Sequence, residues 1–394
     1  SVRRMHTLCN SVIIFDEVQA IPDKCKELFN LAVNFLTQFC NTTVVLCSAT
    51  QPSLTRIKEN NICDCYEMVP DFNKYYNAFK RTNIIDATNI CPNGMSISDL
   101  KDFVLDKLET EGSVLVILNT VKCAIDVFDS LKNEDIPVYH ISNNMCPANK
   151  MDNLDKINKA LKDNQKIICV STQVVEAGVN FSFDCVIRSK AGLDNVIQAA
   201  GRCNRNMEKT AGTVHIVRVV DGQENIIRLD DIREGRNVFL RVLNEYREPI
   251  RKKAKDLSAP EIIERYFQYY FYQRDHLMAY PCRTKNKKEN LLDLLGANQG
   301  NIAKTEGRML RQSFETAANC FAAIDAETQG ILVPYGEGRR IIAQLCSWQP
   351  ENAAALSVQR ELLKKAQRYS VNLYPDVLKK LGNAVACIPE TGLM

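Results

Sequence analysis

The segment Ser11–Gln19, which reads SVIIFDEVQ, joins a short apolar run to a pair of carboxylates. β-Branched and aromatic residues fill Ser11–Phe15, a composition typical of a strand buried on both faces of a parallel sheet. A second apolar run, Thr42–Leu46, follows a helical pattern of leucine, alanine and phenylalanine at residues 28–39. Strand, helix and strand at this spacing predict a βαβ unit.

The same alternation resumes after residues 61–82, a stretch rich in Asn and Tyr that has the composition of a loop. The expected strands are Ser113–Leu118, Val138–Ile141, Lys166–Ser171, Asp184–Ser189 and Thr213–Val217, and the expected helices are Ile97–Glu109, Val121–Asn133, Ala148–Asp163 and Asn195–Ala200. The chain is therefore predicted to have an α/β fold, with helices on both faces of parallel sheets.

The pattern changes after about residue 225. Charged helical segments are expected at Val238–Tyr246 and Glu261–Tyr272, and a small mixed domain from residue 306, with strands at Ile331–Pro334 and Ser370–Leu373. Residues 251–311 hold thirteen Lys/Arg against seven Asp/Glu. Such a segment can line a nucleic-acid path or form a solvated helix face.

The bulk composition excludes several classes of protein. The 394 residues are 45% hydrophobic and 25% charged, without an apolar run that could span a membrane or form a secretory signal. The net charge of +3 is close to neutral, so nucleic acid would have to bind at a local basic patch. The sixteen cysteines form no C-x-x-C pair, which favours reduced thiols in the cytoplasm over a metal site or a disulfide framework.

Two pairs of polar residues follow the first two strands. Asp16 can hold Mg²⁺ through water, and Glu17 can orient and deprotonate an attacking water, although a chance Asp-Glu pair is about equally expected from these residues alone. Ser48 and Thr50 lie about thirty residues further on. Small hydroxyl residues at that position can couple the state of a bound triphosphate to a second ligand.

Two later segments carry phosphate chemistry. In Ser171–Asn180 a pair of hydroxyls lies at the end of a strand, and Gly178 permits a tight turn, so the segment suits a nucleic-acid phosphate. In Gln198–Arg205, which reads QAAGRCNR, Arg202 and Arg205 can lie on one side of a helix end, and arginine supplies a permanent charge for phosphoryl transfer.

These four segments, in this order, resemble motifs II, III, V and VI of superfamily 2 helicases. More closely, the chain resembles the CRISPR-associated helicase–nuclease of type I interference systems. The residues that carry the narrower resemblance are Phe15–Pro22, Leu118–Val121, His140–Ser142, Met145–Pro147, Thr172–Val179, Gln198–Arg205, Val333–Gly338 and Arg368–Leu373.

The resemblance implies an ATP-dependent motor on single-stranded DNA, recruited by the Cascade surveillance complex, in which two RecA-like lobes clamp ATP and Mg²⁺. Residues 1–80 would form part of the first lobe, 81–225 the second lobe, 226–305 a helical linker and 306–394 an accessory domain. The implied roles are metal binding and catalysis for Asp16 and Glu17, γ-phosphate contact for Arg202 and Arg205, nucleotide-cleft positions for Gln19, Gln198, Gly178 and Asn180, and DNA-backbone contact for Thr120 and Thr172.

Some features of that family differ or are absent. Gln19 and Asn180 stand where relatives have His and Asp. None of the sixteen glycines precedes a lysine, so the chain has no G-x-x-x-x-G-K-[ST] phosphate-binding loop, and none of its four histidines precedes an aspartate, as the family's nuclease centre requires. We therefore expect the first lobe to be incomplete, with a missing N-terminal helicase/nuclease part supplied in the same or a separate chain.

Three functions remain open at this point. The chain can be part of a motor that does not hydrolyse ATP alone, a non-catalytic module that binds single-stranded DNA or Cascade, or a fragment of an RNA-directed superfamily 2 helicase. The retained Asp16, Glu17, Arg202 and Arg205 favour the first function, because a simple binding module has no need of hydrolysis residues.

Overall fold

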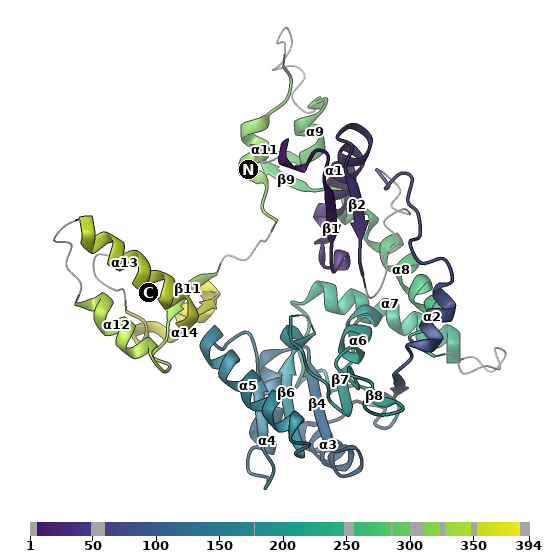
Figure 1. Ribbon diagram of the computed structural model, residues 1–394, viewed down its shortest axis with the longest axis vertical. Helices are drawn as coiled ribbons and strands as arrows, with labels where there is room; N and C mark the ends of the chain where they lie inside the picture. Colours follow the sequence, from purple (N-terminus) through teal and green to yellow (C-terminus); the bar gives the residue numbers. More distant parts are fainter. Residues whose placement is uncertain are drawn as a thin grey trace. The chain divides into compact units, whose positions relative to one another are not determined.

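The computed structural model describes residues 6–48, 60–176, 178–247, 256–284, 287–299, 310–323, 328–347 and 353–386 (Figure 1). The chain divides into two compact units. The first unit contains residues 1–79 and 237–325, and the second contains 80–236 and 326–394. Helix α7 (Asp230–Arg247) includes one of the three points in the chain where one unit passes to the other.

A six-stranded parallel sheet organises the second unit, in the order β3-β8-β7-β4-β6-β5. Its strands are β3 (Thr82–Asp86), β4 (Ser113–Leu118), β5 (Val138–Ile141), β6 (Ile167–Thr172), β7 (Cys185–Ser189) and β8 (Gly212–Val217). The intervening helices are α3 (Ile97–Glu111), α4 (Val121–Leu131), α5 (Pro147–Lys162) and α6 (Leu193–Ala200). This is the RecA-like parallel sheet that the sequence predicts.

The alternation of side chains along β4 shows how the sheet is covered. Val114, Val116 and Leu118 pack with residues of α3 and α4, whereas Leu115 and Ile117 pack with residues of α5 and α6. All five side chains are fully buried. Because successive side chains of a strand point to opposite faces, a strand covered on both sides must be apolar at every position. Helices therefore cover both faces of the sheet.

Among the elements that the sequence prediction missed are two that precede α3. Strand β3 forms one edge of the sheet, and helix α2 (Phe72–Ala78) lies within the stretch predicted to be loop. Only two of the five β3 residues are isoleucine and the burial along the strand alternates, as expected at an edge. A short, mostly polar edge strand lacks the continuous apolar run that identified its neighbours.

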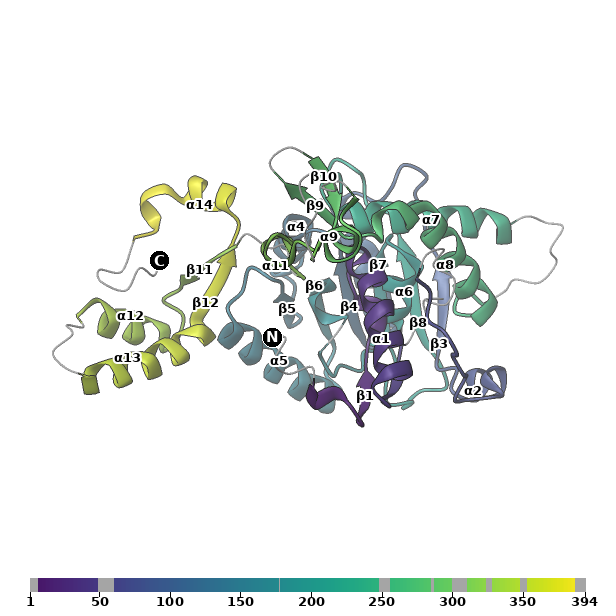
Figure 2. The same ribbon diagram turned by 90° about the horizontal axis from the view of Figure 1, so that it is seen from above.

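The C-terminal part of the second unit contains an antiparallel pair, β11 (Gln329–Leu332) and β12 (Ser370–Leu373), which fits the predicted mixed domain (Figure 2). Its helices are α12 (Gly338–Cys346), α13 (Ala353–Ala366) and α14 (Pro375–Leu381). Val371 packs in one buried cluster with Cys146 and Ala148 at the start of α5. The Tyr335 hydroxyl donates to the Asp152 carboxylate at 2.7 Å, which fixes this part to the same helix.

In the first unit, β1 (Val12–Phe15) and β2 (Thr43–Leu46) form a parallel pair beside α1 (Lys26–Phe39). Phe15 packs on Phe29 with ring centroids 5.0 Å apart. On the other side of β1, Val12 and Ile14 are 68% and 65% exposed. The described part of the first unit therefore leaves one face of this pair uncovered.

Helices from the later part of the chain complete the first unit: the second half of α7, α8 (Pro260–Arg274), α9 (Leu291–Leu295) and α11 (Phe314–Cys320), with the hairpin β9 (Pro281–Thr284) and β10 (Lys287–Asn290). Tyr280, Leu291 and Leu294 pack against Leu28 of α1. Among the described residues, no helix combines the length and the apolar character needed to cross a membrane.

Candidate functional site

The first group of predicted residues follows β1. Asp16 and Glu17 are exposed, and the Glu17 backbone N–H donates to Asp16 Oδ1 at 3.0 Å. Glu17 has φ 54° and ψ 44°, in the left-handed region that is uncommon for residues other than glycine. Such conformations cost energy and concentrate at functional sites. The conformation therefore fits a functional position for Glu17, but eight other non-glycine residues among those described share a positive φ.

Gln19 connects this pair to the segment that follows β2. Its amide nitrogen donates to the Glu17 carboxylate, and its amide oxygen accepts from the Ser48 hydroxyl at 2.5 Å. The predicted motif II and motif III segments are thus joined within the first unit. Thr50 lies outside the described residues.

The Asp16 carboxylate provides oxygen donors of the type that Mg²⁺ prefers. It is exposed at a strand end, and only its Oδ1 is used in the hydrogen bond to Glu17. A single carboxylate with space around it suits an ion that keeps several of its waters. Among the described residues there is no group of three or more His, Cys, Asp or Glu side chains that could hold a metal by themselves.

The second group lies in the second unit, where loops follow the strands β4 and β6. Thr120 begins α4, and its hydroxyl accepts from the Cys123 N–H at 3.3 Å. Thr172 ends β6 and is 4% exposed. Its hydroxyl has no hydrogen-bond partner among the described residues, which is costly for a buried polar group.

Arg202 joins the motif VI segment to the motif V segment. The residue is 7% exposed, and its Nε and Nη2 donate to the carbonyls of Val175 and Glu176 at 2.8 and 2.6 Å. Two hydrogen bonds from one planar group fix both the guanidinium and the backbone that accepts them. The structure therefore brings the two segments together through this arginine.

The other predicted residues of these segments are more accessible. Arg205 is half-buried, and its backbone carbonyl accepts from Arg81 Nη1 at 3.3 Å. Gln198 is also half-buried, on α6, whereas Gly178 and Asn180 are exposed in the loop after β6. Gly178 has φ 72°, so this loop makes the left-handed turn that its glycine permits. All the residues of this second group belong to the second unit, whereas the first unit contains Asp16, Glu17, Gln19 and Ser48.

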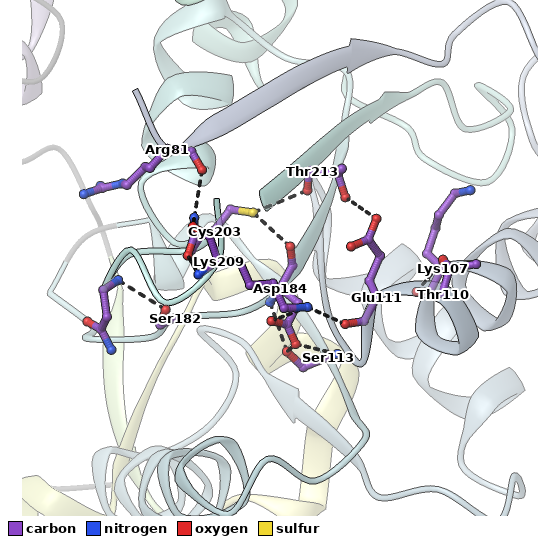
Figure 3. Close-up of polar contacts among 12 residues, drawn as sticks. Arg81, Lys107, Thr110, Glu111, Ser113, Ser182, Asp184, Cys203, Lys209 and Thr213 are labelled. Carbon is purple, nitrogen blue, oxygen red and sulfur yellow. Dashed lines mark hydrogen bonds and ion pairs between the residues drawn. The ribbon is translucent and has the colours of Figure 1, made fainter. Parts of the chain in front are cut away.

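Figure 3 shows how the end of the motif VI segment is held near the starts of β7 and β8. The Cys203 thiol donates to the carbonyls of Asp184 and Thr213 at 3.3 and 3.4 Å. The Asn204 amide donates to the carbonyls of Arg81 and Lys209 at 3.1 and 2.8 Å. These contacts fix the path of the backbone that follows Arg202.

The sequence analysis missed a buried ion pair beside Arg202. Arg188 of β7 and Glu176 of the motif V segment approach to 2.8 Å, and their side chains are 0% and 4% exposed. Burial raises the pKa of Glu176 to about 6, and the attraction of Arg188 offsets only part of that effect. An arginine within the otherwise apolar run Cys185–Ser189 was the available signal, because a strand covered on both faces rarely carries a charge.

The parallel sheet with helices on both faces is RecA-like, and Arg202 joins the two segments that the sequence analysis compares with motifs V and VI of superfamily 2 helicases. Residues 110–208 match the family model described as "CRISPR-associated nuclease/helicase Cas3, C-terminal". Residues 110–208 are therefore similar to the C-terminal domain that this family model describes.

Curated relatives agree with this family. A CRISPR-associated nuclease/helicase Cas3 of Methanothermobacter thermautotrophicus is 29% identical over 114 residues, which are 29% of this chain and 14% of the relative. The Streptococcus thermophilus protein of the same name is 26% identical over 230 residues, 50% of this chain and 24% of the relative. The chain thus spans less than a quarter of either relative in these matches.

Among solved structures, that of T. fusca Cas3-AMPPNP is similar with a TM-score of 0.55 and 14% identity. The similarity covers 92% of this chain and 47% of that one. At this level of identity the comparison supports the fold, and the chain spans about half of the solved protein.

Proposed function

We propose that the chain is part of an ATP-dependent motor that moves along single-stranded DNA in type I CRISPR interference. Its cofactors would be ATP and Mg²⁺. Its partners would be single-stranded DNA, a Cascade-type surveillance complex and a segment or chain that carries the phosphate-binding loop. The relatives named nuclease/helicase and the solved T. fusca Cas3 with AMPPNP support this assignment.

The observation that carries the proposal is the attachment of Arg202 to the loop after Thr172. In this assignment Arg202 and Arg205 contact the γ-phosphate, and Thr172 contacts the DNA backbone. A change at the phosphate would reach the DNA contact through five residues of chain and two hydrogen bonds. Coupling between two ligands can run through hydrogen-bond networks of this kind.

Asp16 and Glu17 would act in the nucleotide cleft. Mg²⁺ held by Asp16 through water would neutralise charge on the phosphates. Glu17 would orient the attacking water and accept its proton, and the bond from Gln19 keeps the Glu17 carboxylate in place. Within the 394 residues no G-x-x-x-x-G-K-[ST] loop is present to complete this cleft.

That missing sequence favours one alternative, a module that binds single-stranded DNA or Cascade without hydrolysing ATP. An ATPase assay on the 394-residue chain tests the expectation that it does not hydrolyse ATP alone, and a binding assay tests which nucleic acid it binds. We expect no hydrolysis of ATP, with or without oligo(dT). Turnover that disappears in Glu17→Gln would contradict this expectation.

The binding assay uses fluorescence anisotropy with labelled oligo(dT), the matching duplex and oligo(rU), each of about 30 nucleotides. We expect oligo(dT) to bind most tightly, with an affinity that falls steeply as salt increases. Thr172→Val should weaken this binding, whereas Thr110→Val, at an exposed position on α3, should leave it unchanged. Preference for oligo(rU), or no binding at all, would overturn the proposed function.

A further inference from the structure

The ion pair of Glu176 and Arg188 is part of a larger set of buried polar contacts in the second unit. Arg188 Nη1 donates to Asn119 Oδ1 and to the Ser189 carbonyl, both at 2.8 Å. Arg188 therefore touches the segment after β6 with one side of its guanidinium and the segment after β4 with the other.

Asn119 is held from a second direction by Glu224, which follows β8. The Asn119 backbone N–H donates to Glu224 Oε1 at 2.6 Å, and its side-chain amide donates to Oε2 at 3.0 Å. The Ser189 hydroxyl also donates to the Glu224 carboxylate. Asn119 and Glu224 are 4% and 7% exposed, so water does not replace these contacts.

Glu176 completes the connection to Arg202. Its carboxylate pairs with Arg188, and its backbone carbonyl accepts from Arg202 Nη2 at 2.6 Å. A continuous path of polar contacts thus runs from Arg202 through Glu176 and Arg188 to Asn119, which directly precedes Thr120. One end is Arg202, proposed to contact the γ-phosphate, and the other is Asn119, next to Thr120, which is expected to contact the DNA backbone.

Stability alone does not account for this arrangement. Removing two charges from water costs about as much as their attraction returns, and well-packed apolar residues are often as stable or more stable in their place. What a chain of buried polar contacts supplies is a defined relative geometry for the groups that it joins. The ends of this network are the groups for which geometry would matter.

We infer that Glu176 and Arg188 are positioning residues, which hold Arg202 and the Asn119–Thr120 segment in one fixed relation to each other. The roles of Arg202 at the γ-phosphate and of Thr120 at DNA, which this inference assumes, rest on the proposed function. The positioning itself rests only on the contacts described above. Neither residue contacts nucleotide or DNA in this assignment.

The test replaces the ion pair with apolar residues, in Glu176→Met/Arg188→Met. The matched control is Lys101→Met/Glu134→Met, which removes a partly exposed ion pair of 2.6 Å from the same unit. Urea unfolding first shows whether each variant is as stable as the wild type. Hydrogen exchange is then measured for residues 118–124 and 172–182, and anisotropy measures the affinity for labelled oligo(dT).

We expect faster exchange in both segments of the Met/Met variant and affinity for oligo(dT) about tenfold lower, with the control within about twofold of the wild type. A role in stability alone predicts wild-type affinity in a variant of wild-type stability. If the Met/Met variant does not fold, Glu176→Gln takes its place, because it keeps the shape and removes the charge.

Two outcomes separate this inference from the proposed function. Wild-type exchange in both segments, in a folded variant that lacks the pair, overturns the inference and leaves the proposed function intact. Failure of the wild-type chain to bind oligo(dT) overturns the proposed function, and the exchange comparison still decides whether the pair positions the two segments.

Discussion

Glu176 places a carboxylate where little water can reach it. The residue is 5% exposed, and its side chain contacts Arg188 and, at 3.4 Å, the Asn195 amide. Removing a carboxylate from water disfavours its charged form, whereas a neighbouring arginine favours it. Burial is the larger effect here, so the pKa of Glu176 rises from 4.5 to about 6.

This shift predicts a pH dependence of stability. A carboxyl group whose pKa is higher in the folded than in the unfolded chain binds its proton more tightly when folded. Its stabilising contribution is complete below pH 4.5 and is lost as the pH rises through about 6. Relative to Glu176→Gln, the wild type should lose about 2 kcal/mol of unfolding free energy over that interval.

Urea unfolding of both chains, from about pH 4.5 to about pH 7, measures this difference. Glu134→Gln is the matched control, because it removes a carboxylate from the partly exposed pair with Lys101. A difference that grows in favour of the wild type as the pH rises would mean that the attraction of Arg188 outweighs burial.

At the scale of elements, the segment between α6 and β8 depends on a close approach of the Cys203 and Asn204 side chains to the backbone of Gly212. A Cβ atom added to Gly212, at the start of β8, would lie 2.5 Å from Cys203 Sγ and 2.9 Å from Asn204 Cβ. Both distances are shorter than side chains tolerate. A glycine at this position therefore lets the end of the motif VI segment lie against the sheet.

Gly212→Ala should force β8 and the Cys203–Asn204 segment apart. We expect a loss of about 2 kcal/mol of unfolding free energy, which is typical of overpacking in a buried site. Gly222→Ala is the control, because a Cβ atom there would meet nothing within 4 Å. Thermal unfolding of the three chains tests this, and equal midpoints for both variants would show that the close approach is unimportant.

At the scale of the whole molecule, the two units differ in how completely their sheets are covered. The second unit buries a six-stranded sheet between helices on both faces. The described part of the first unit pairs β1 only with β2 and leaves Val12 and Ile14 largely exposed. Large exposed apolar side chains on one strand face are expected where another surface covers them.

This difference predicts unequal protection from hydrogen exchange in the 394-residue chain. Residues 12–46 should exchange faster than residues 113–217, because a two-stranded pair opens more easily than a sheet with two covered faces. Mass spectrometry of peptides from the two ranges measures this directly. Equal protection would show that the first unit is stable without further cover.

The sequence by itself determined the parts of the molecule whose residues carry a local signal. Mostly apolar runs identified β1, β2 and β4 to β8, and polar residues that follow these strands or a helix identified Asp16, Glu17, Thr172 and Arg202 as site candidates. These predictions depend on periodicity and on side-chain chemistry, and both are visible in residues that are close together in the sequence.

Only the tertiary structure decided which distant residues meet. The bridge of Gln19 between Glu17 and Ser48, and the path from Arg202 through Glu176 and Arg188 to Asn119, join segments of the chain that are far apart in sequence. Such contacts exist because parallel strands bring their ends to one edge of a sheet, and the order of those strands follows from packing. An arginine in an apolar strand was visible in the sequence, but its partner became evident only when the sheet had formed.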